Sequence, residues 1–149
     1  MAIAAALAAC GPKIEAAQNI ENGPQTGLER VILTIHSANG AHRFDVEVAE
    51  TFEQQQTGLM YRRSLGPDRG MIFPMDPPRD ASFWMHNTLI PLDIVFIRPD
   101  RRIARITTAR PLDDSPVPSG EPVAAVLEIR GGRAAELGIR AGDRVDWPR

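Results

Sequence analysis

This chain has only one cysteine, and neither positive nor negative charge is in large excess. The 149 residues include one cysteine, Cys10, which excludes a disulfide within the chain and a zinc cluster built on cysteines. The 17 basic and 19 acidic residues leave a net charge of −2. We therefore expect no nucleic-acid partner, because nucleic-acid-binding proteins present a strongly basic surface. The apolar run at residues 1–9 is also too short for a membrane-spanning helix, which takes about 18–20 residues.

Motifs for metals and for nucleophilic catalysis are lacking as well. The three histidines, His36, His42 and His86, are dispersed, and no pair has the helical spacing of metal ligands. No serine or second cysteine stands in a nucleophile motif, so the sequence indicates no nucleophilic serine or cysteine, and the catalytic residues, if there are any, stay unknown. We expect no metal and no cofactor. A chain of this length forms one domain and buries enough apolar surface to fold without them.

The N-terminus has the pattern of an export signal. Residues 7–10, Leu-Ala-Ala-Cys, resemble the lipobox of bacterial lipoproteins, in which the cysteine becomes the acylated first residue of the mature protein. We expect a signal segment at 1–10, lipidation at Cys10 and a flexible tether over 11–27, which is rich in glycine, proline and polar residues.

The residue after the cysteine bears on location. By the same resemblance, Gly11 in place of an aspartate favours the outer membrane, so we expect an anchored lipoprotein on the periplasmic face of the bacterial envelope. No lysine or arginine precedes the apolar run. Either the true start codon lies further upstream, or the segment is a poor export signal. The alternative to a lipoprotein is an alanine-rich tail with a chance cysteine.

Residues 28–149 have the pattern of a single β-rich domain. Asn39-Gly40 is a hairpin turn signal between two strands, the second of which alternates apolar and charged side chains. Thr51 and Gln54 have capping-box spacing, which predicts a short helix over about 52–60. Seven or eight short strands and two short helices favour a sandwich or barrel. The later strands are expected near 71–73, 82–88, 92–97, 103–108, 123–129 and 143–147.

Four blocks resemble the DUF192 family, a prokaryotic family without an assigned activity. They are Gly58-Leu59-Met60-Tyr61-Arg62, Gly70-Met71-Ile72-Phe73, the stretch from Phe83 to Ile97, and Val126-Leu127-Glu128 with the glycine-containing residues 131–143. The resemblance covers about residues 42–147 and implies a compact antiparallel β-sandwich or barrel of jelly-roll type. The chain departs from the family at His86, where a lysine or arginine is usual.

Six residues in these blocks are candidates for a ligand-binding site: Arg62, Trp84, His86, Asn87, Asp93 and Glu128. Asp93 and Glu128 stand within apolar strands, where burial of an unpaired carboxylate is costly. Either these side chains converge on a cleft, or Arg62 neutralises a carboxylate while Asn87 satisfies loop backbone groups. We favour the second, structural interpretation.

Two hypotheses concern the residues before Leu89-Ile90. If the strands on either side of this bend pair, His86 faces Asp93 and forms a titratable ion pair with it. If Trp84 is exposed, its ring can stack on a sugar or on a proline of a peptide. The alternative for Trp84 is a partly buried packing residue.

The expected function is binding rather than catalysis. We expect a lipid-anchored envelope domain that binds a small molecule or assists an envelope protein. One alternative is a hydrolase or isomerase acting on sugars through Asp93 and Glu128, for which glycosidase chemistry places two carboxylates about 5 Å or about 6.5–9.5 Å apart around a cleft. The other is a structural module that binds a partner through an exposed apolar patch.

Overall fold

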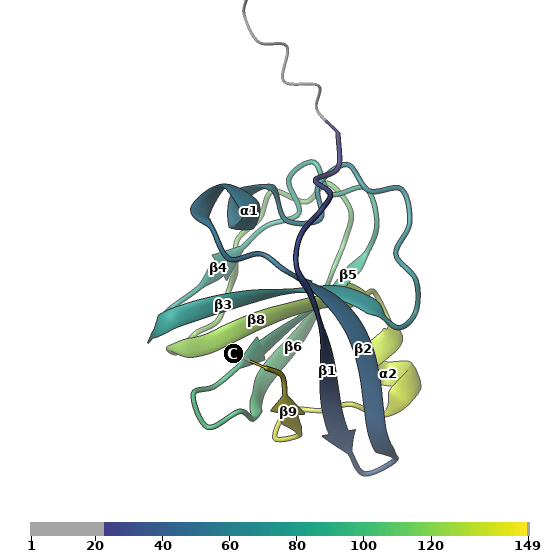
Figure 1. Cartoon of the computed structure of the whole chain (residues 1–149), viewed down its shortest axis with the longest axis vertical. Helices are drawn as coiled ribbons and strands as arrows, with labels where there is room; N and C mark the ends of the chain where they lie inside the picture. The colour runs from purple at the N-terminus through teal and green to yellow at the C-terminus, as the bar shows by residue number, and fades with distance from the viewer. Residues whose placement is uncertain (1–22, 149) are drawn as a thin grey trace, which may run out of the picture.

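A computed structural model describes residues 23–148 of the chain (Figure 1). The expected signal segment, the lipidation site Cys10 and residues 11–22 of the expected tether lie outside this range. Within residues 23–148, no helix has both the length and the apolar character needed to span a bilayer.

Strands dominate the described residues, and the two helices are short, which confirms the expectation of a mainly β domain. The elements in chain order are β1 (Arg30–Ser37), β2 (Gly40–Val48), α1 (Phe52–Thr57), β3 (Arg69–Arg79), β4 (Ser82–Phe83), β5 (Leu92–Ile97), β6 (Ile103–Ala109), β7 (Val117–Pro118), β8 (Val123–Arg130), α2 (Arg133–Leu137) and β9 (Arg144–Asp146).

Seven of the strands form one curled sheet in the order β6-β5-β8-β3-β2-β1-β9, while β4 and β7 form a separate pair. The curl brings the two edges of the sheet together at one end. Arg102, just before β6, bridges Arg144 of β9, and the backbone N–H of Ile103 donates to the carbonyl of Asp143 at 2.9 Å. The domain is therefore a half-barrel made from a single sheet (Figure 1).

The expectation of purely antiparallel pairing is wrong at one place, because β2 and β3 are parallel. The cause is the connection between them, in which residues 49–68, including α1, carry the chain back to the end from which β2 started. The other neighbouring strands in the sheet are antiparallel. The jelly-roll arrangement is not confirmed.

The local turn and cap signals hold. β1 and β2 form a hairpin whose last pair is Ser37 and Gly40. At α1 both halves of the capping box are present, since Thr51 accepts from the backbone of Gln54 and the Gln54 side chain accepts from the backbone of Thr51. The helix ends at Thr57, earlier than expected, because Gly58 takes φ 47° and leaves the helical region.

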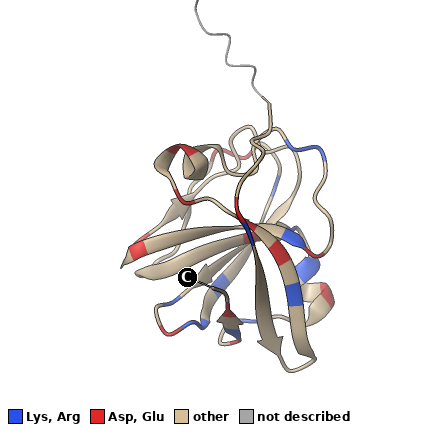
Figure 2. Cartoon of the chain, viewed as in Figure 1, with Lys and Arg blue, Asp and Glu red and all other residues tan. Residues whose placement is uncertain are grey.

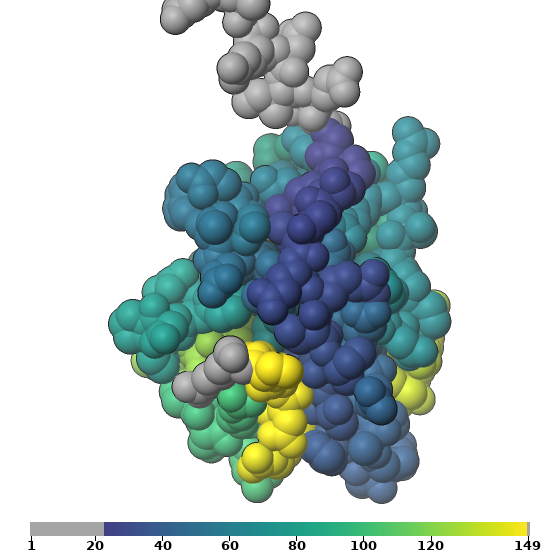
Figure 3. All heavy atoms as spheres, in the orientation of Figure 1, coloured from purple at the N-terminus to yellow at the C-terminus, as the bar shows by residue number. Residues whose placement is uncertain are grey.

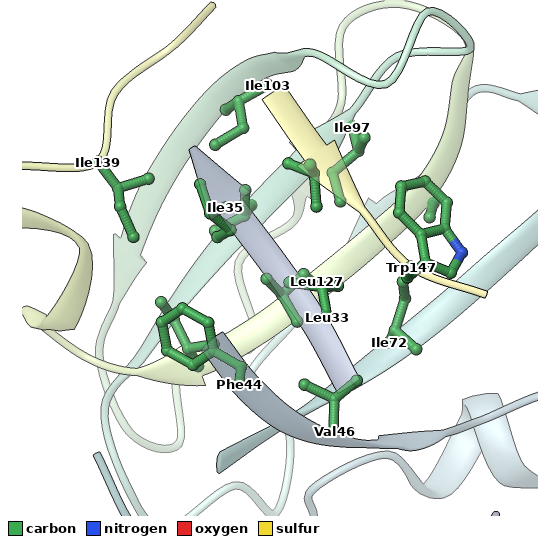
Figure 4. Packing of buried hydrophobic residues seen from close by; sticks show 14 of the residues in the cluster. Leu33, Ile35, Phe44, Val46, Ile72, Ile97, Ile103, Leu127, Ile139 and Trp147 are labelled. Atoms are coloured by element: carbon green, nitrogen blue, oxygen red, sulfur yellow. The ribbon is translucent and has the colours of Figure 1, made fainter. Parts of the chain in front are cut away.

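The curl creates two apolar cores, one on each face of the central strands. All six residues of β5 are buried, since its neighbours β6 and β8 continue the sheet and both of its faces are covered. Figure 4 shows the core inside the curl, in which Leu33 and Ile35 of β1 pack with Leu127 of β8. The second core lies on the outer, convex face, beneath the loops and β4; it includes Leu59, Met71, Phe73, Met85, Ile94, Phe96 and Val126.

Candidate functional site

A groove of about 270 Å³ opens on the concave side of the sheet, where β1 and β2 lie beside the second half of β3. Figure 3 shows this side, with the C-terminal residues (yellow) between β3 and β1. The walls are apolar because the inward side chains of three neighbouring strands meet here, namely Val31, Val48 and Ile72. Met75 and Trp147 complete the apolar lining.

Trp147 is held in place as one wall of this groove. Its side chain is nearly buried, with 8% of its surface exposed. The guanidinium carbon of Arg101 lies 4.0 Å from the centre of the indole ring, and Nη1 of Arg101 donates to the Trp147 carbonyl at 2.8 Å. A cation stacked on the ring and bonded to the backbone fixes the indole before any ligand arrives.

Three carboxylates, Glu29, Glu50 and Asp76, stand around the groove. Each is exposed, and none has an ion-pair partner among residues 23–148. Asp45, by contrast, is paired with Arg30. The described residues contain no group of three His, Cys, Asp or Glu side chains able to hold a metal ion. An apolar floor under unpaired carboxylates suits an organic cation that carries an apolar group.

Asp93, a predicted site residue, is sealed inside the domain with 1% of its surface exposed. Its carboxylate accepts three hydrogen bonds, from the hydroxyl of Thr108 at 2.7 Å, from the backbone N–H of Gly132 at 3.0 Å and from that of Ala134 at 2.9 Å. Gly132 is the N-cap of α2 and has no side chain to cap the helix, so Asp93 satisfies the free N–H groups from β5. Its role is structural.

Glu128 is buried on the other face of the same sheet, with 4% of its surface exposed. It stands between Met71 of β3 and Ile94 of β5, both of which belong to the convex core. None of the described residues forms a hydrogen bond or an ion pair with its carboxyl group. Loss of hydration in this apolar site raises the pKa of Glu128 to about 8.

The hypothesis of a sugar-acting enzyme built on Asp93 and Glu128 is wrong for this geometry. Asp93 pairs with Ile129 across the strands, whereas Glu128 pairs with Ile94, the residue after Asp93. Because successive side chains of a strand point to opposite faces, the two carboxyl groups lie on opposite sides of the sheet. They cannot flank one glycosidic bond.

Arg62 neutralises a carboxylate, as the structural interpretation required, but the partner is Glu47 of β2. The guanidinium makes two hydrogen bonds to this carboxylate, of 2.5 and 3.0 Å, and Nη2 also donates to the Gln25 carbonyl at 3.1 Å. Both side chains are largely buried, at 17% and 11% exposure. Sequence spacing contained no signal for this pair, because the partners come from a loop and from the parallel strand before it.

Asn87 links two loops. Its side-chain amide donates to the hydroxyl of Tyr61 at 2.9 Å, and its carbonyl accepts from the backbone N–H of Tyr61 at 2.9 Å. Asn87 has φ 51°, in the left-handed region that asparagine tolerates, so the strand expected over 82–88 cannot pass through residue 87. The observed strand β4 ends at Phe83, where its pairing with the two residues of β7 ends. The role of Asn87 is to tie the loop after α1 to the loop before β5.

The hypothesis that His86 faces Asp93 is wrong. His86 Nδ1 lies 2.8 Å from Asp114 in the loop after β6, and the ring stacks on Trp84 with the centroids 4.6 Å apart. The bend at residues 87–91 turns the chain away, so the strands do not pair around it. Trp84 is exposed, at 48%, which was the condition for a stacking role.

The six predicted residues therefore do not form one site. The structure stacks Trp84 on His86 at the surface, pairs Arg62 with Glu47, and buries Asp93 and Glu128 on opposite faces of the sheet. Sequence reasoning missed the groove residues Glu29, Glu50, Asp76 and Trp147. No spacing rule links them, because they meet only through the curl of the sheet.

These features define a class: a small half-barrel domain with a ligand-sized groove on its concave face. The chain belongs to the DUF192 family, whose model, described as "Uncharacterized ACR, COG1430", matches residues 34–147. It is similar to a UPF0127 protein of Thermococcus sibiricus, with 28% identity over 102 residues that cover 68% of this chain and 65% of that protein. The chain thus spans less than two thirds of the length of this curated relative.

Two solved structures have the same fold. A protein of unknown function from Novosphingobium aromaticivorans is 50% identical and superposes with a TM-score of 0.81, covering 83% of this chain and 89% of that one. A protein from Sinorhizobium meliloti, described as a candidate transcription regulator, is 38% identical with a TM-score of 0.79, covering 83% of this chain and 97% of that one. The family and its structures carry no assigned biochemical function that transfers to this chain.

Proposed function

We propose that this protein is a lipid-anchored domain of the bacterial envelope that binds a small cationic, partly apolar ligand in the groove on its concave face, without chemical conversion. The observation that carries the proposal is the combination of Glu29, Glu50 and Asp76, which have no ion-pair partner among the described residues, with an apolar floor closed by Trp147. Carboxylates on a groove rim attract a cation and orient it, while the floor removes its apolar part from water.

The size of the groove limits the ligand. A volume of about 270 Å³ lies near the lower end of the range for small-molecule sites, which is roughly 300–1,000 Å³. This space suits an alkylamine of moderate length or one basic side chain of a peptide better than a sugar chain.

Fluorescence of Trp147 provides a direct test. The chain has two tryptophans, so Trp84→Phe leaves Trp147 as the only reporter. In this background we expect octylammonium to produce a saturable change in fluorescence, and octanoate and octanol to bind at least about tenfold more weakly because they lack the positive charge. The double variant Glu50→Gln, Asp76→Asn is expected to weaken octylammonium binding by about tenfold.

The matched control is Glu53→Gln, which removes one exposed carboxylate of α1 outside the groove. It is expected to leave the affinity unchanged. Equal affinity for octanoate and octylammonium, or full affinity in the double variant, would show that the groove does not select cations.

The envelope anchor is tested separately by labelling with palmitate. The wild-type chain is expected to incorporate the label and Cys10→Ala to lose it, because the cysteine thiol is the acyl acceptor. Equal labelling of the two chains would remove the anchor from the proposal and leave the groove untouched.

A partner-binding module is the second candidate. Trp84, Leu89 and Leu112 are exposed at 48%, 44% and 60%. They lie on two loops joined by hydrogen bonds, including one from the N–H of Leu112 to the carbonyl of Thr88 at 3.0 Å. Exposed apolar residues grouped in this way are typical of contact surfaces. Loss of capture of an envelope protein in Trp84→Ala, with octylammonium binding retained, would favour this candidate.

A further inference from the structure

A second cleft, separate from the groove, lies where the N-terminal segment enters the domain. It is open and has a volume of about 530 Å³. Residues 24–28 form one side, and four arginines, Arg30, Arg62, Arg63 and Arg69, stand around it. We call this set the basic cleft. In Figure 2 basic residues colour the upper part of the loop between α1 and β3, beside the incoming N-terminal segment.

The basic cleft keeps an excess of positive charge after its internal pairs are counted. Arg62 is matched by Glu47, and Arg30 and Arg69 share one carboxylate, that of Asp45. No described residue pairs with the guanidinium of Arg63, which is exposed. Four arginines against two carboxylates leave a local charge of +2 on a chain whose net charge is −2.

The carboxylate that Arg30 and Arg69 share keeps its negative charge near neutral pH, because the hydrogen bond from Arg30 holds the pKa of Asp45 below its usual range. Guanidinium groups suit phosphate in particular, because their N–H groups match its oxygens in pairs.

The position of the cleft in the chain indicates which phosphate-bearing partner lies near it. Gln25, on one side of the cleft, is held by the domain: its amide donates to the carbonyls of Gln54 at 2.9 Å and of Gly58 at 2.8 Å. Only residues 11–24 separate this point from Cys10. Even fully extended they reach about 50 Å, so an acyl group on Cys10 keeps this end of the domain near the bilayer.

We propose that the basic cleft docks the domain on the head groups of anionic phospholipids in the membrane that anchors it. The choice of a membrane as the partner rests on the proposed lipid anchor. The charge of the cleft complements that of phosphate, and the anchored segment delivers that face of the domain to the surface. The lipid on Cys10 and the arginines then act as the two signals that stable attachment of a singly anchored protein requires.

Vesicle binding of the full chain carrying Cys10→Ala tests the cleft without the anchor. We measure affinity for phosphatidylcholine vesicles and for vesicles with one third phosphatidylglycerol. Apolar residues 1–9 contribute to both, so the ratio of the two affinities reports the charge-dependent part. We expect the ratio to exceed about tenfold at low salt. Arg63→Glu removes the local excess of two positive charges, each worth about fivefold, and is expected to bring the ratio down to about one.

Arg43→Glu is the matched control, because Arg43 is an exposed arginine of β2 that lies outside the cleft and forms no ion pair with any residue from 23 to 148. It changes the net charge equally and is expected to leave the ratio within about twofold. A ratio near one in the Cys10→Ala chain that keeps Arg63, or an equal fall of the ratio in Arg63→Glu and Arg43→Glu, would overturn the proposal. So would binding of glycerol phosphate that depends on Arg63 but occurs without vesicle binding, since it would assign the cleft to a soluble phosphate. Palmitate labelling reports on the anchor alone, so the two failures are distinguishable.

Discussion

A buried carboxyl group has opposite surroundings on the two faces of the central strands. On the concave face Asp93 accepts three hydrogen bonds and caps α2, so its carboxyl group has a structural role. On the convex face Glu128 receives none from the described residues and stands between Met71 and Ile94. The residues are close in the sheet register, yet one accepts hydrogen bonds from three donors while burial raises the pKa of the other. Burial alone therefore does not determine what a carboxylate contributes; the donors around it do.

The largest expected effect concerns the pH dependence of stability through Glu128. Its pKa is about 8 in the folded domain against an ordinary value of 4.5, so the folded state holds a proton that the unfolded state releases. The contribution of protonated Glu128 to the free energy of unfolding is fully present below about pH 4.5, and it is lost as the pH rises to about 8. The loss is on the order of 5 kcal/mol over that window.

Urea denaturation of the wild type and of Glu128→Gln at pH 5, 7 and 9 measures this loss, because the variant removes the titrating group and leaves the other groups in place. The difference between the two chains is expected to shift in favour of the variant as the pH rises. A difference that stays constant from pH 5 to 9 would mean that Glu128 is hydrated in the folded state.

The next effect concerns Asp93. Asp93→Ala leaves the hydroxyl of Thr108 and two backbone N–H groups without their acceptor, and we expect a loss of about 3–4 kcal/mol in the free energy of unfolding. The control is Asp114→Ala, which removes an exposed carboxylate that contacts His86 and should cost less than about 1 kcal/mol. If Asp93→Ala lowers the free energy of unfolding as little as Asp114→Ala does, the hydrogen bonds of Asp93 do not stabilise the domain, and the difference between the two faces does not hold.

A third prediction concerns the ion pair on the convex side. Arg62→Ala strands the carboxylate of Glu47, which is only 11% exposed, and is expected to cost about 2 kcal/mol. Arg98→Ala, in the exposed pair of Arg98 and Glu121, should destabilise the domain much less, because solvent screens an exposed pair. Thermal or urea unfolding measures both. Equal costs would indicate that the pair of Arg62 is solvated in solution.

The smallest effect on stability is expected at the N-terminus of α1. Thr51→Ala removes the N-cap of α1 and should cost about 1 kcal/mol. Thr57→Ala, at the last residue of the same helix, changes a threonine without a capping bond and serves as the control. If the two variants melt together, the capping box contributes nothing to stability.

Local features were predictable because they depend on neighbours in the chain. The hairpin at Asn39-Gly40 and the capping box of Thr51 follow from backbone preferences that act over four residues. The strand expected across Ser82–Thr88 failed because the backbone of Asn87 bonds to Tyr61, and this contact joins residues 26 positions apart. Likewise His86 met Asp114 and not Asp93, through a loop whose path no sequence pattern indicated.

The candidate site depended still more on long-range placement. Alternation shows that Asp93 and an adjacent residue of β5 face opposite ways, but the register of β5 against β8 was needed to place Glu128 on the far face. The groove needed the curl of the whole sheet and the return of Trp147 to β1.

The sequence by itself determined that the described residues form short strands and capped turns and that the chain belongs to the DUF192 family. Alternation, turn residues and block motifs can be read from neighbouring positions in the chain. Only the tertiary structure decided which charges have partners. The curled sheet, with its one parallel pair of strands, brings together residues that are distant in the sequence. The face on which a buried carboxyl group lies therefore decides whether it finds hydrogen-bond donors, as Asp93 does, or none among the described residues, as with Glu128.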